Sequence, residues 1–500
     1  MQVEEFLKSL IEKDILITPD ALELLKSSEE AFKGVNEILT ERNVFILTKQ
    51  IIEEKLKEKE EKKVPLPEEI QVNRSGNFKP LAREYKADFK IIERHDVSGK
   101  SKCTGIVDDF VGYFRDRYRK TLNVLRTRTG KVGISPMISL KSMMRGREVR
   151  IAGIVNSKNV TKKGDLLIEM EDEEEVAKVL VLKNDKECFE KANKLIMDEV
   201  VAVDGRASGP FVIANDIVWP ELPINQQKKT EKDLGIAFIS DTHVGSRFFM
   251  QKQFVKMLKW LNGGIDGDRN RELVGKIKYL ILAGDVVDGI GVYPRQEKEL
   301  VIRDIYGQYK EFGKLLQNVP DYIEVFIGPG NHDAVRRAEP QPKLPKELTD
   351  EINAPANVHY LGSPSTIEVE GLKTLVYHGT SIDSVIASIP GLSYQNPEKC
   401  LIELLKRRHL SPIYGENPIV PEEKDYMFIE DSIDIFHTGH VHRNGYVNYR
   451  GVAVVNSGAW QDRTDFQVRQ GHVPTPCIMP IYETHYAKMN FVNFLAGEGV

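Results

Sequence analysis

The 500-residue sequence lacks the features that mark secreted, membrane or disulfide-stabilised proteins. No run of about 18 apolar residues occurs, and the N-terminal Met-Gln-Val-Glu-Glu has no apolar stretch of the signal-peptide kind. There are four cysteines and no Cys-x-x-Cys pair, so neither a disulfide framework nor a zinc ribbon is indicated. These absences predict a protein of the reducing cytoplasm that makes no membrane contact.

An excess of positive charge is absent as well. The formal net charge is -5 and the isoelectric point is near 6.2. A protein that coats nucleic acid by electrostatics alone needs a basic surface that releases counterions from phosphates, and this composition excludes that mode. Any contact with DNA must therefore be local or shared with a partner.

The length and the changes of pattern along the chain predict several domains, because 500 residues exceed what one hydrophobic core normally serves. In the first stretch, apolar residues recur at helical spacing, and Thr18-Pro19 is a typical helix start. The predicted organisation is a small α-helical module at 1–62, a linker at 63–100, an OB-fold β-barrel at 101–222, a linker at 223–233 and an α/β domain at 234–500.

Short β-rich runs support the barrel. They are Val149–Val155, Leu166–Met170, Val179–Leu182 and Val200–Val203. A stretch of helical composition lies between the third and fourth runs, which is the order of an OB barrel. Such barrels often bind single strands by stacking bases on aromatic side chains, yet residues 149–182 contain no Phe, Tyr or Trp. The composition therefore favours a protein-docking barrel over a DNA-binding one.

One segment before the barrel is basic, Arg115-Asp-Arg-Tyr-Arg-Lys120. It could contact phosphate, although a run of this kind is more often a solvated helix face. Both interpretations stay open from the sequence.

Beyond residue 234, five short apolar runs alternate with helical segments, which predicts an α/β domain. The runs are Ile236–Ile239, Tyr279–Leu282, Ile323–Ile327, Thr374–Val376 and Ile433–Ile435. A short polar motif follows each of them. Because the loops beyond the carboxyl ends of such strands converge on one rim, motifs far apart in the sequence can form one site.

The five motifs offer carboxylates, an amide and imidazoles, the ligand mixture that suits divalent transition metals or Mn²⁺. Each motif alone is weak, but the ordered set predicts a metal site. Side chains alternate along an extended segment, so the two residues of Asp-x-His, and those of His-x-His, are expected to face one side. In chain order the motifs are Asp241-Thr-His243, Ala283-Gly-Asp285-Val-Val-Asp288, Gly330-Asn331-His332-Asp333, Tyr377-His378-Gly379 and Thr438-Gly439-His440-Val-His442.

This motif order resembles that of the calcineurin-like metallophosphoesterase superfamily over residues 234–460. The resemblance implies a two-sheet α/β sandwich flanked by helices. It also implies two divalent metal ions, with Mn²⁺ expected and Mg²⁺, Fe or Zn as alternatives.

The resemblance further implies a role for every motif residue. The residues expected to hold the first metal are Asp241, His243 and His442. Those expected to hold the second are Asn331, His378 and His440, with Asp285 bridging the two. His332 is expected to be the general acid or to steady the phosphoryl oxygens, and Asp333 to orient its ring.

Arginines in or beside the motif loops are candidates for binding substrate. A two-metal site with few carboxylates keeps a positive charge that attracts a phosphodiester, and arginines can clamp flanking phosphates. Any one of them can equally be simple surface charge. The candidates are Arg247, Arg295, Arg336 and Arg443.

The domain order indicates the substrate, which the site alone does not give. A helical module, an OB-like domain and a phosphoesterase domain, in that order, resemble the small subunits of archaeal family D DNA polymerases, as do Gly451–Trp460 and Pro474–Ile478. The resemblance implies a 3′-5′ exonuclease that proofreads single-stranded DNA ends. It also implies a large catalytic subunit as partner, in a heterodimer or heterotetramer, a sliding clamp as a further candidate partner, and a cytoplasmic, nucleoid-associated location.

Two alternatives stay open. A stand-alone DNA repair or RNA-processing metallonuclease would use the same site, but proteins of that kind carry the phosphoesterase domain near the N-terminus, whereas residues 1–233 precede it here. A chiefly structural subunit would dock the large subunit without using its metals.

Overall fold

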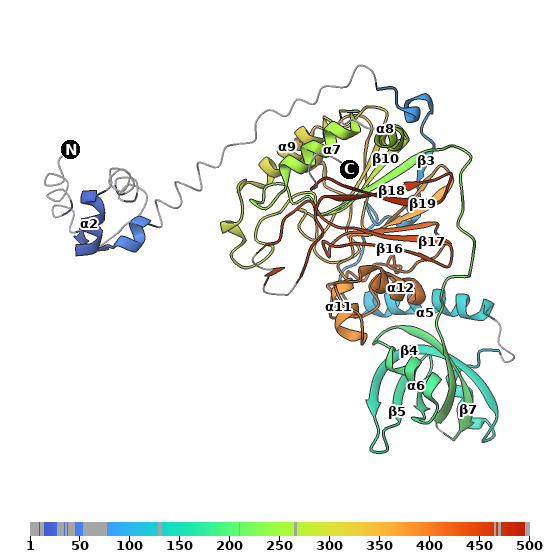
Figure 1. Cartoon of the computed structure of the whole chain (residues 1–500). Coiled ribbons are helices and arrows are strands. Elements are labelled where there is room, and N and C mark those ends of the chain that lie inside the picture. The colour runs from blue at the N-terminus through green and yellow to red at the C-terminus, as the bar shows by residue number, and fades with distance from the viewer. Residues whose placement is uncertain are drawn as a thin grey trace. The chain divides into compact units, whose positions relative to one another are not determined.

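The chain divides into two compact units, Met1–Ile70 and Gln71–Val500 (Figure 1). The computed structural model describes residues 10, 15–27, 35, 38, 46–53, 78–128, 133–209, 211–264, 268–464, 467–468 and 472–495.

The described residues of the first unit include helix α2, further helical residues at 49–53 and a pair of two-residue parallel strands. Helix α2 (Pro19–Ser27) begins at Pro19, as the Thr18-Pro19 pair predicts, because proline at the first helical position needs no N–H partner. The strands β1 (Leu16–Ile17) and β2 (Ile46–Leu47) were not predicted. The helical-module prediction for 1–62 stays a prediction, and most of that range lies outside the described residues.

Five strands of the second unit close into a barrel in the order β4-β5-β6-β8-β7. Burial alternates along β5, which sends every second side chain into the barrel core. Helix α6 (Lys186–Asn193) lies between the third and fourth strands, the position that the OB prediction gives it. The strands are β4 (Glu148–Val160), β5 (Leu166–Glu171), β6 (Val176–Val181), β7 (Val200–Ser208) and β8 (Phe211–Val218); the short helix η3 (Met137–Ser142) precedes them.

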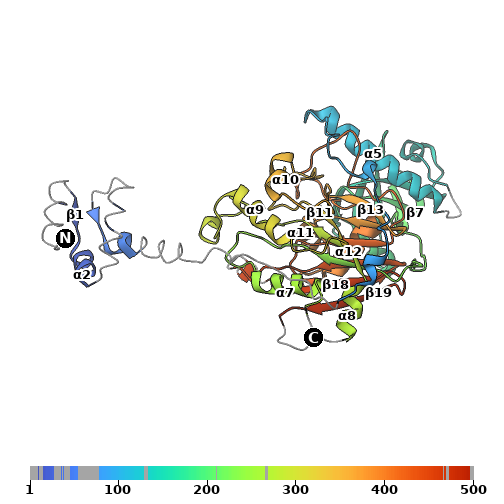
Figure 2. The same ribbon diagram turned by 90° about the horizontal axis from the view of Figure 1, so that it is seen from above.

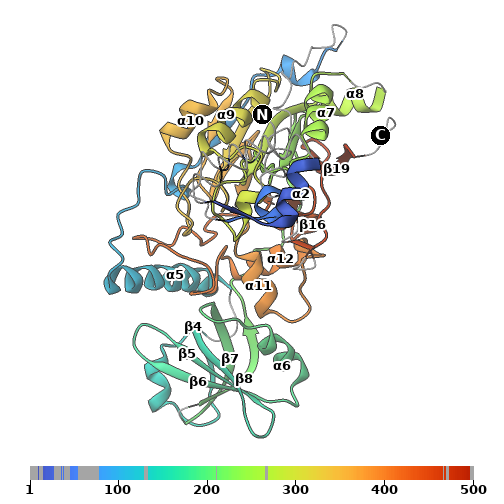
Figure 3. The same ribbon diagram turned by 90° about the vertical axis from the view of Figure 1, so that its left-hand side faces the viewer.

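Helix α5 (Val107–Thr127) carries the basic segment, packs against the barrel strands β4 and β7, and lies at the level of helices α11 and α12 of the α/β domain (Figure 3). Arg117 is buried, and its Nε donates to Asp425 Oδ2 at 2.9 Å. Arg115 and Arg119 both pair with Glu173, at 3.6 and 2.7 Å. Arg117 is therefore bound within the protein, so the structure supports neither the phosphate-contact nor the solvated-face interpretation for it, whereas Arg115 and Arg119 are exposed.

The α/β domain is a sandwich of two six-stranded sheets, as the superfamily resemblance implies. Large side chains of both sheets, including Phe238, Phe326 and Ile435, meet in one core between them. The first sheet has the order β12-β11-β10-β9-β18-β19 and comprises β9 (Gly235–Ile239), β10 (Ile277–Ala283), β11 (Glu324–Gly328), β12 (Val358–Tyr360), β18 (Ile478–Glu483) and β19 (Lys488–Asn493). The second has the order β16-β17-β15-β14-β13-β3 and comprises β3 (Phe89–Ile91), β13 (Ser365–Val369), β14 (Leu372–Val376), β15 (Ile435–Thr438), β16 (Asn444–Tyr449) and β17 (Val452–Ser457).

Helices cover the outer faces of the sandwich. Helices α7 to α10 lie on the side of the first sheet and α11 and α12 on the side of the second (Figures 1 and 2). Among the described helices, none has both the length and the apolar character of a membrane span. Their bounds are α7 (Gln251–Leu261), α8 (Asp268–Gly275), α9 (Ile305–Leu316), α10 (Lys346–Ile352), α11 (Ile382–Ser388) and α12 (Pro397–Arg407).

The predicted linker of 63–100 is wrong for its last part. Strand β3 pairs with β13 at the edge of the second sheet. Asp96 is buried and accepts a hydrogen bond from Gly362 N at 2.8 Å. A three-residue edge strand in a polar stretch gives no periodic signal, so the sequence reads as a linker where the chain is part of the sandwich. The other predicted domain boundaries stay predictions.

Candidate metal centre

The five motif loops follow the carboxyl ends of β9, β10, β11, β14 and β15. These strands run parallel within their sheets, as the pairings of β9 with β10, β10 with β11 and β14 with β15 show. Their loops therefore reach one rim of the sandwich. All seven predicted metal ligands meet there, in two groups of side-chain atoms that share one carboxylate.

The first group consists of Asp241, His243 and His442, with Asp285 beside them. His442 Nε2 lies 3.3 Å from Asp241 Oδ1. His243 Nε2 lies 3.1 Å from His442 Nε2 and 3.8 Å from both Asp241 Oδ1 and Asp285 Oδ2. All four side chains are buried.

The second group consists of Asn331, His378 and His440, and again Asp285. Asn331 Oδ1 lies 2.9 Å from His378 Nε2 and 3.0 Å from His440 Nδ1. His378 Nε2 also lies 3.2 Å from Asp285 Oδ2. Asp285 is thus the residue that the two groups have in common.

The chemistry of these donors fits cations. His243 Nδ1 lies 3.0 Å from Asp288 Oδ1, so the carboxylate holds the proton on Nδ1 and the lone pair of Nε2 faces His442. Burial lowers the pKa of His378, but the neighbouring carboxylate of Asp285 outweighs it and raises that pKa to about 10. The cluster therefore attracts positive charge to the positions that metal ions would fill.

The backbone at the site is not extended, which corrects one expectation. Asp241 and His243 have φ of 52° and 48°, and His440 and His442 have φ of 71° and 56°. These left-handed conformations are costly for residues with a Cβ and persist only where tertiary contacts impose them. Asp241 and His243 belong to one ligand group, whereas His440 and His442 belong to different groups, and both pairs are placed by tight turns rather than by strand alternation.

The turn at Gly330 needs glycine. A Cβ on Gly330 would lie 2.2 Å from Asp285 Oδ1, a distance that no side chain can occupy. The glycine allows the β11 loop to pass directly against the shared carboxylate.

His332 lies at the site, but Asp333 does not orient its ring. His332 Nδ1 lies 2.7 Å from the Asp288 carbonyl oxygen, and its backbone N–H donates to Asp285 Oδ1 at 2.8 Å. Asp333 instead accepts the Gly330 N–H at 2.8 Å. The expected role of Asp333 is therefore wrong: it holds the β11 loop, and the backbone of Asp288 orients His332. Burial, with the nearby Asp285 carboxylate, raises the pKa of Asp333 to about 7.

Several residues of the site carry no recognisable motif. Asp288 contacts His243 and is held by Gln461 Nε2 at 3.0 Å. Asp383 Oδ2 lies 3.0 Å from His440 Nε2, which is the carboxylate–histidine pairing that orients a metal-binding ring. Of these, only Asp288 had a signal, because it stands three residues after Asp285 in the second motif.

None of the four candidate arginines lines the cavity at the site. Arg336 donates to the Pro340 carbonyl and to Glu422 Oε1, both at 2.8 Å, so it is a structural residue and the prediction of a phosphate clamp is wrong for it. Arg443 Nε donates to the Gln395 carbonyl at 2.9 Å. Arg247 and Arg295 are exposed, and their predicted role stays a prediction.

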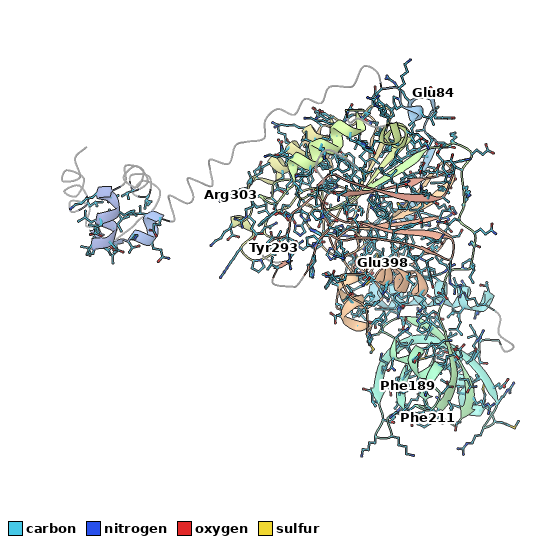
Figure 4. All side chains as sticks on the ribbon, in the orientation of Figure 1. Glu84, Phe189, Phe211, Tyr293, Arg303 and Glu398 are labelled. Atoms are coloured by element: carbon cyan, nitrogen blue, oxygen red, sulfur yellow. The ribbon has the colours of Figure 1, made fainter. Side chains whose placement is uncertain are left out.

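A cavity of about 270 Å³ opens onto the two ligand groups. It is lined by residues of the α/β domain alone, among them Tyr293, which Figure 4 labels well away from Phe189 and Phe211 of the barrel. The barrel therefore contributes no side chain to the wall of this cavity.

The family model for calcineurin-like phosphoesterases matches residues 234–444, which contain all five motif loops. The second unit thus carries a calcineurin-like phosphoesterase domain. Three curated relatives named DNA polymerase II small subunit extend the similarity to most of the chain. Identity is 42% to the Methanocaldococcus jannaschii protein, over 82% of this chain and 70% of that one. It is 41% to the Archaeoglobus fulgidus protein, over 95% of both, and 37% to the Methanothermobacter thermautotrophicus protein, over 97% and 99%. The chain belongs to the DNA polymerase II small subunit family, and the resemblance drawn from its domain order is confirmed.

Proposed function

We propose that this chain is the 3′-5′ exonuclease subunit of a two-subunit DNA polymerase, which hydrolyses phosphodiester bonds at single-stranded DNA ends and also binds the large catalytic subunit. The observation that carries the proposal is the meeting of two ligand groups at Asp285, in an open cavity beside His332. Family membership supports the polymerase context, since a small subunit by its name has a larger partner.

The residues present fit two divalent ions. Asp241, His243 and His442 would hold one, Asn331, His378 and His440 the other, and Asp285 both. Mixed nitrogen and oxygen donors favour Mn²⁺ among the candidates. When bound, such a pair of ions neutralises phosphodiester charge and makes water a stronger nucleophile at neutral pH.

His332 is the residue suited to move a proton. Burial lowers its pKa, so the ring is neutral at pH 7, with the Nδ1 proton donated to the Asp288 carbonyl. That arrangement leaves Nε2 for an oxygen of the substrate or of water. In the neutral ring Nε2 accepts a proton, and it can return that proton to the departing 3′ oxygen.

The barrel supports a docking role rather than a DNA-binding one. Strands β4, β5 and β6 carry no aromatic residue that could stack a base. The acidic chain supports a division of labour in which the partner supplies most of the DNA-binding surface. A sliding clamp as a further partner stays a prediction.

The test is excision by the purified chain with Mn²⁺ on single-stranded DNA labelled at its 5′ end. We expect products that shorten from the 3′ end, and no products after His440→Ala. Labelled mononucleotides released from the 5′ end would contradict the polarity. Undiminished excision by His440→Ala would contradict the site.

Copurification separates an enzyme from a purely structural subunit. The Asp285→Asn variant should still assemble with the large subunit while losing excision. A stand-alone nuclease would form no complex with it. Excision unchanged in the assembled Asp285→Asn variant would overturn the catalytic role.

A further inference from the structure

Two aromatic rings from distant loops meet in the wall of the cavity. Tyr394 lies in the loop between α11 and α12, and His472 lies in the loop between β17 and β18. Their ring centroids are 4.0 Å apart, with an angle of 37° between the planes. Both side chains are half-buried and line the cavity. The pair therefore presents an aromatic surface to any ligand that enters the cavity.

The pair is joined directly to the second ligand group. The Tyr394 hydroxyl lies near the Asp383 carboxylate, and Asp383 Oδ2 lies 3.0 Å from His440 Nε2. His440 in turn contacts Asn331 through Nδ1 at 3.0 Å. A group that rests on the Tyr394–His472 pair therefore shares one cavity with His440 of the second ligand group.

The segment at residues 461–467 adds polar side chains to the cavity. Gln467 Nε2 lies 2.8 Å from His442 Nδ1, and Thr464 and Gln461 also line the cavity. A ligand that suits the whole wall joins a flat aromatic ring to a charged, hydrogen-bonding backbone. A nucleotide has that composition, and aromatic side chains stack on bases of any sequence.

We propose that the Tyr394–His472 pair is a stacking platform for the base of the 3′-terminal nucleotide, a role that rests on the proposed exonuclease function. A base in a duplex is already paired and stacked, and taking it out costs free energy. The platform therefore selects unpaired 3′ ends, and because every base has a π-face it does so without preference for one base.

A competing role for Tyr394 is to position His440 through Asp383. The two roles separate by substitution, because Tyr394→Phe keeps the ring and removes the hydroxyl, whereas Tyr394→Leu removes both. His472→Ala removes the second ring without touching the contact with Asp383. Tyr486 is exposed on another part of the domain and outside the cavity lining, so Tyr486→Leu is a matched control.

The experiment compares two single-stranded DNAs that differ only in whether the 3′-terminal nucleotide carries a base or is abasic. For the unsubstituted chain we expect KM about tenfold higher on the abasic strand, in line with the usual contribution of one base–aromatic stack. Tyr394→Leu and His472→Ala should raise KM about tenfold on the normal strand and leave it unchanged on the abasic strand. Tyr394→Phe should keep KM and lower kcat, and Tyr486→Leu should change neither.

Two results would overturn the platform. One is equal KM for both strands with the unsubstituted chain. The other is an equal loss on both strands in Tyr394→Leu and His472→Ala, which would leave only a positioning role. Should Tyr394→Leu fail to fold, His472→Ala decides alone.

A fluorescence measurement separates failure of the platform from failure of the proposed function. A 3′-terminal 2-aminopurine loses fluorescence when it stacks, and binding reports this without excision. We expect quenching by the unsubstituted chain and less by His472→Ala. Quenching without excision would reject the exonuclease activity and keep the stacking platform. Excision without quenching would reject the stacking platform and keep the exonuclease activity.

Discussion

Two buried clusters of charged side chains lie in the second unit, and they differ in whether their charges are already matched. One joins α5 to the loop at residues 409–427: Arg117 donates to Asp425 at 2.9 Å, and His409 Nε2 lies 2.7 Å from the same carboxylate. The other is the metal centre, where His243 Nε2 and His442 Nε2 lie 3.1 Å apart and both face the carboxylate of Asp241, at 3.8 and 3.3 Å.

In the Arg117 cluster the donors and acceptors match one another. Arg117 also donates to the Pro412 carbonyl at 2.9 Å, and His409 Nδ1 accepts the Ser411 N–H at 3.0 Å. At the metal centre the acceptors face one another instead. A buried polar cluster whose donors and acceptors are all paired stabilises the fold. A buried cluster whose acceptor atoms converge on one point is suited to bind a ligand there.

The largest expected effect comes from the shared carboxylate. Asp285→Asn keeps the shape and removes the charge common to both groups, so excision should fall by about 10³-fold or more, the scale of losing a central electrostatic contact. The measurement is the rate of excision at saturating Mn²⁺, with circular dichroism to show that the fold is intact. Less than a tenfold loss would place the chemistry elsewhere.

A substitution in the Arg117 cluster should lower the stability of the fold rather than the rate of excision. Arg117→Met leaves Asp425 buried without its cation, and the free energy of unfolding should fall by about 3–5 kcal/mol. Arg119→Met is the matched control, because Arg119 is 61% exposed and should contribute less than about 1 kcal/mol. Equal stability of the two variants in denaturant titrations would contradict the comparison.

The same cluster should make the fold sensitive to acid. Burial lowers the pKa of His409 to about 4, against 6.5 for the free side chain. Below pH 6.5, His409 therefore binds a proton in the unfolded chain but stays neutral in the native chain. The free energy of unfolding falls as the pH is lowered from 6.5 to 4, by up to about 1.4 kcal/mol per pH unit.

The variant His409→Gln tests whether His409 causes the loss of stability in acid. The variant should lose stability less steeply over that pH interval in denaturant titrations. Asp425 has a lowered pKa, so its own contribution is lost only below its ordinary value of 3.8. An unchanged slope between pH 6.5 and 4 in His409→Gln would assign the acid sensitivity to other groups.

The smallest of these effects is expected at Asp383, outside the ligand groups. Asp383→Asn removes the charge that orients His440, and Mn²⁺ affinity should fall about 10- to 100-fold, as for other carboxylates behind a metal-binding histidine. Titration calorimetry measures it, with Glu173→Gln as a control carboxylate on the barrel. No change in affinity would mean that His440 needs no such support.

That the seven predicted ligands meet at one site could be foreseen from the sequence, because each motif directly follows an apolar run, and apolar runs mark the strands of an α/β sheet. The strand ends were harder. The apolar run Ile433–Ile435 predicts a strand that ends at Ile435, but strand β15 spans Ile435–Thr438. The strand continues because His437 is polar and yet buried, with its Nε2 3.0 Å from Ser457 Oγ. Counting apolar residues ends such a strand too early.

The rest could not be predicted, because it depends on loops that meet only in the fold. Asp383, Tyr394 and His472 have no fixed spacing from any motif. The left-handed backbone at Asp241 was also invisible, since tertiary hydrogen bonds, such as the one from Asp241 N to the Gly284 carbonyl at 3.0 Å, override local preference.

The most direct test of the account is the number of Mn²⁺ ions that the chain binds, counted by metal analysis after equilibrium dialysis. Two ions per chain are predicted. His243→Ala should keep one, through the second ligand group, and Asp285→Ala should bind neither tightly. A single ion in the unsubstituted chain, or two ions retained by Asp285→Ala, would contradict the claim that two metal pockets share this carboxylate.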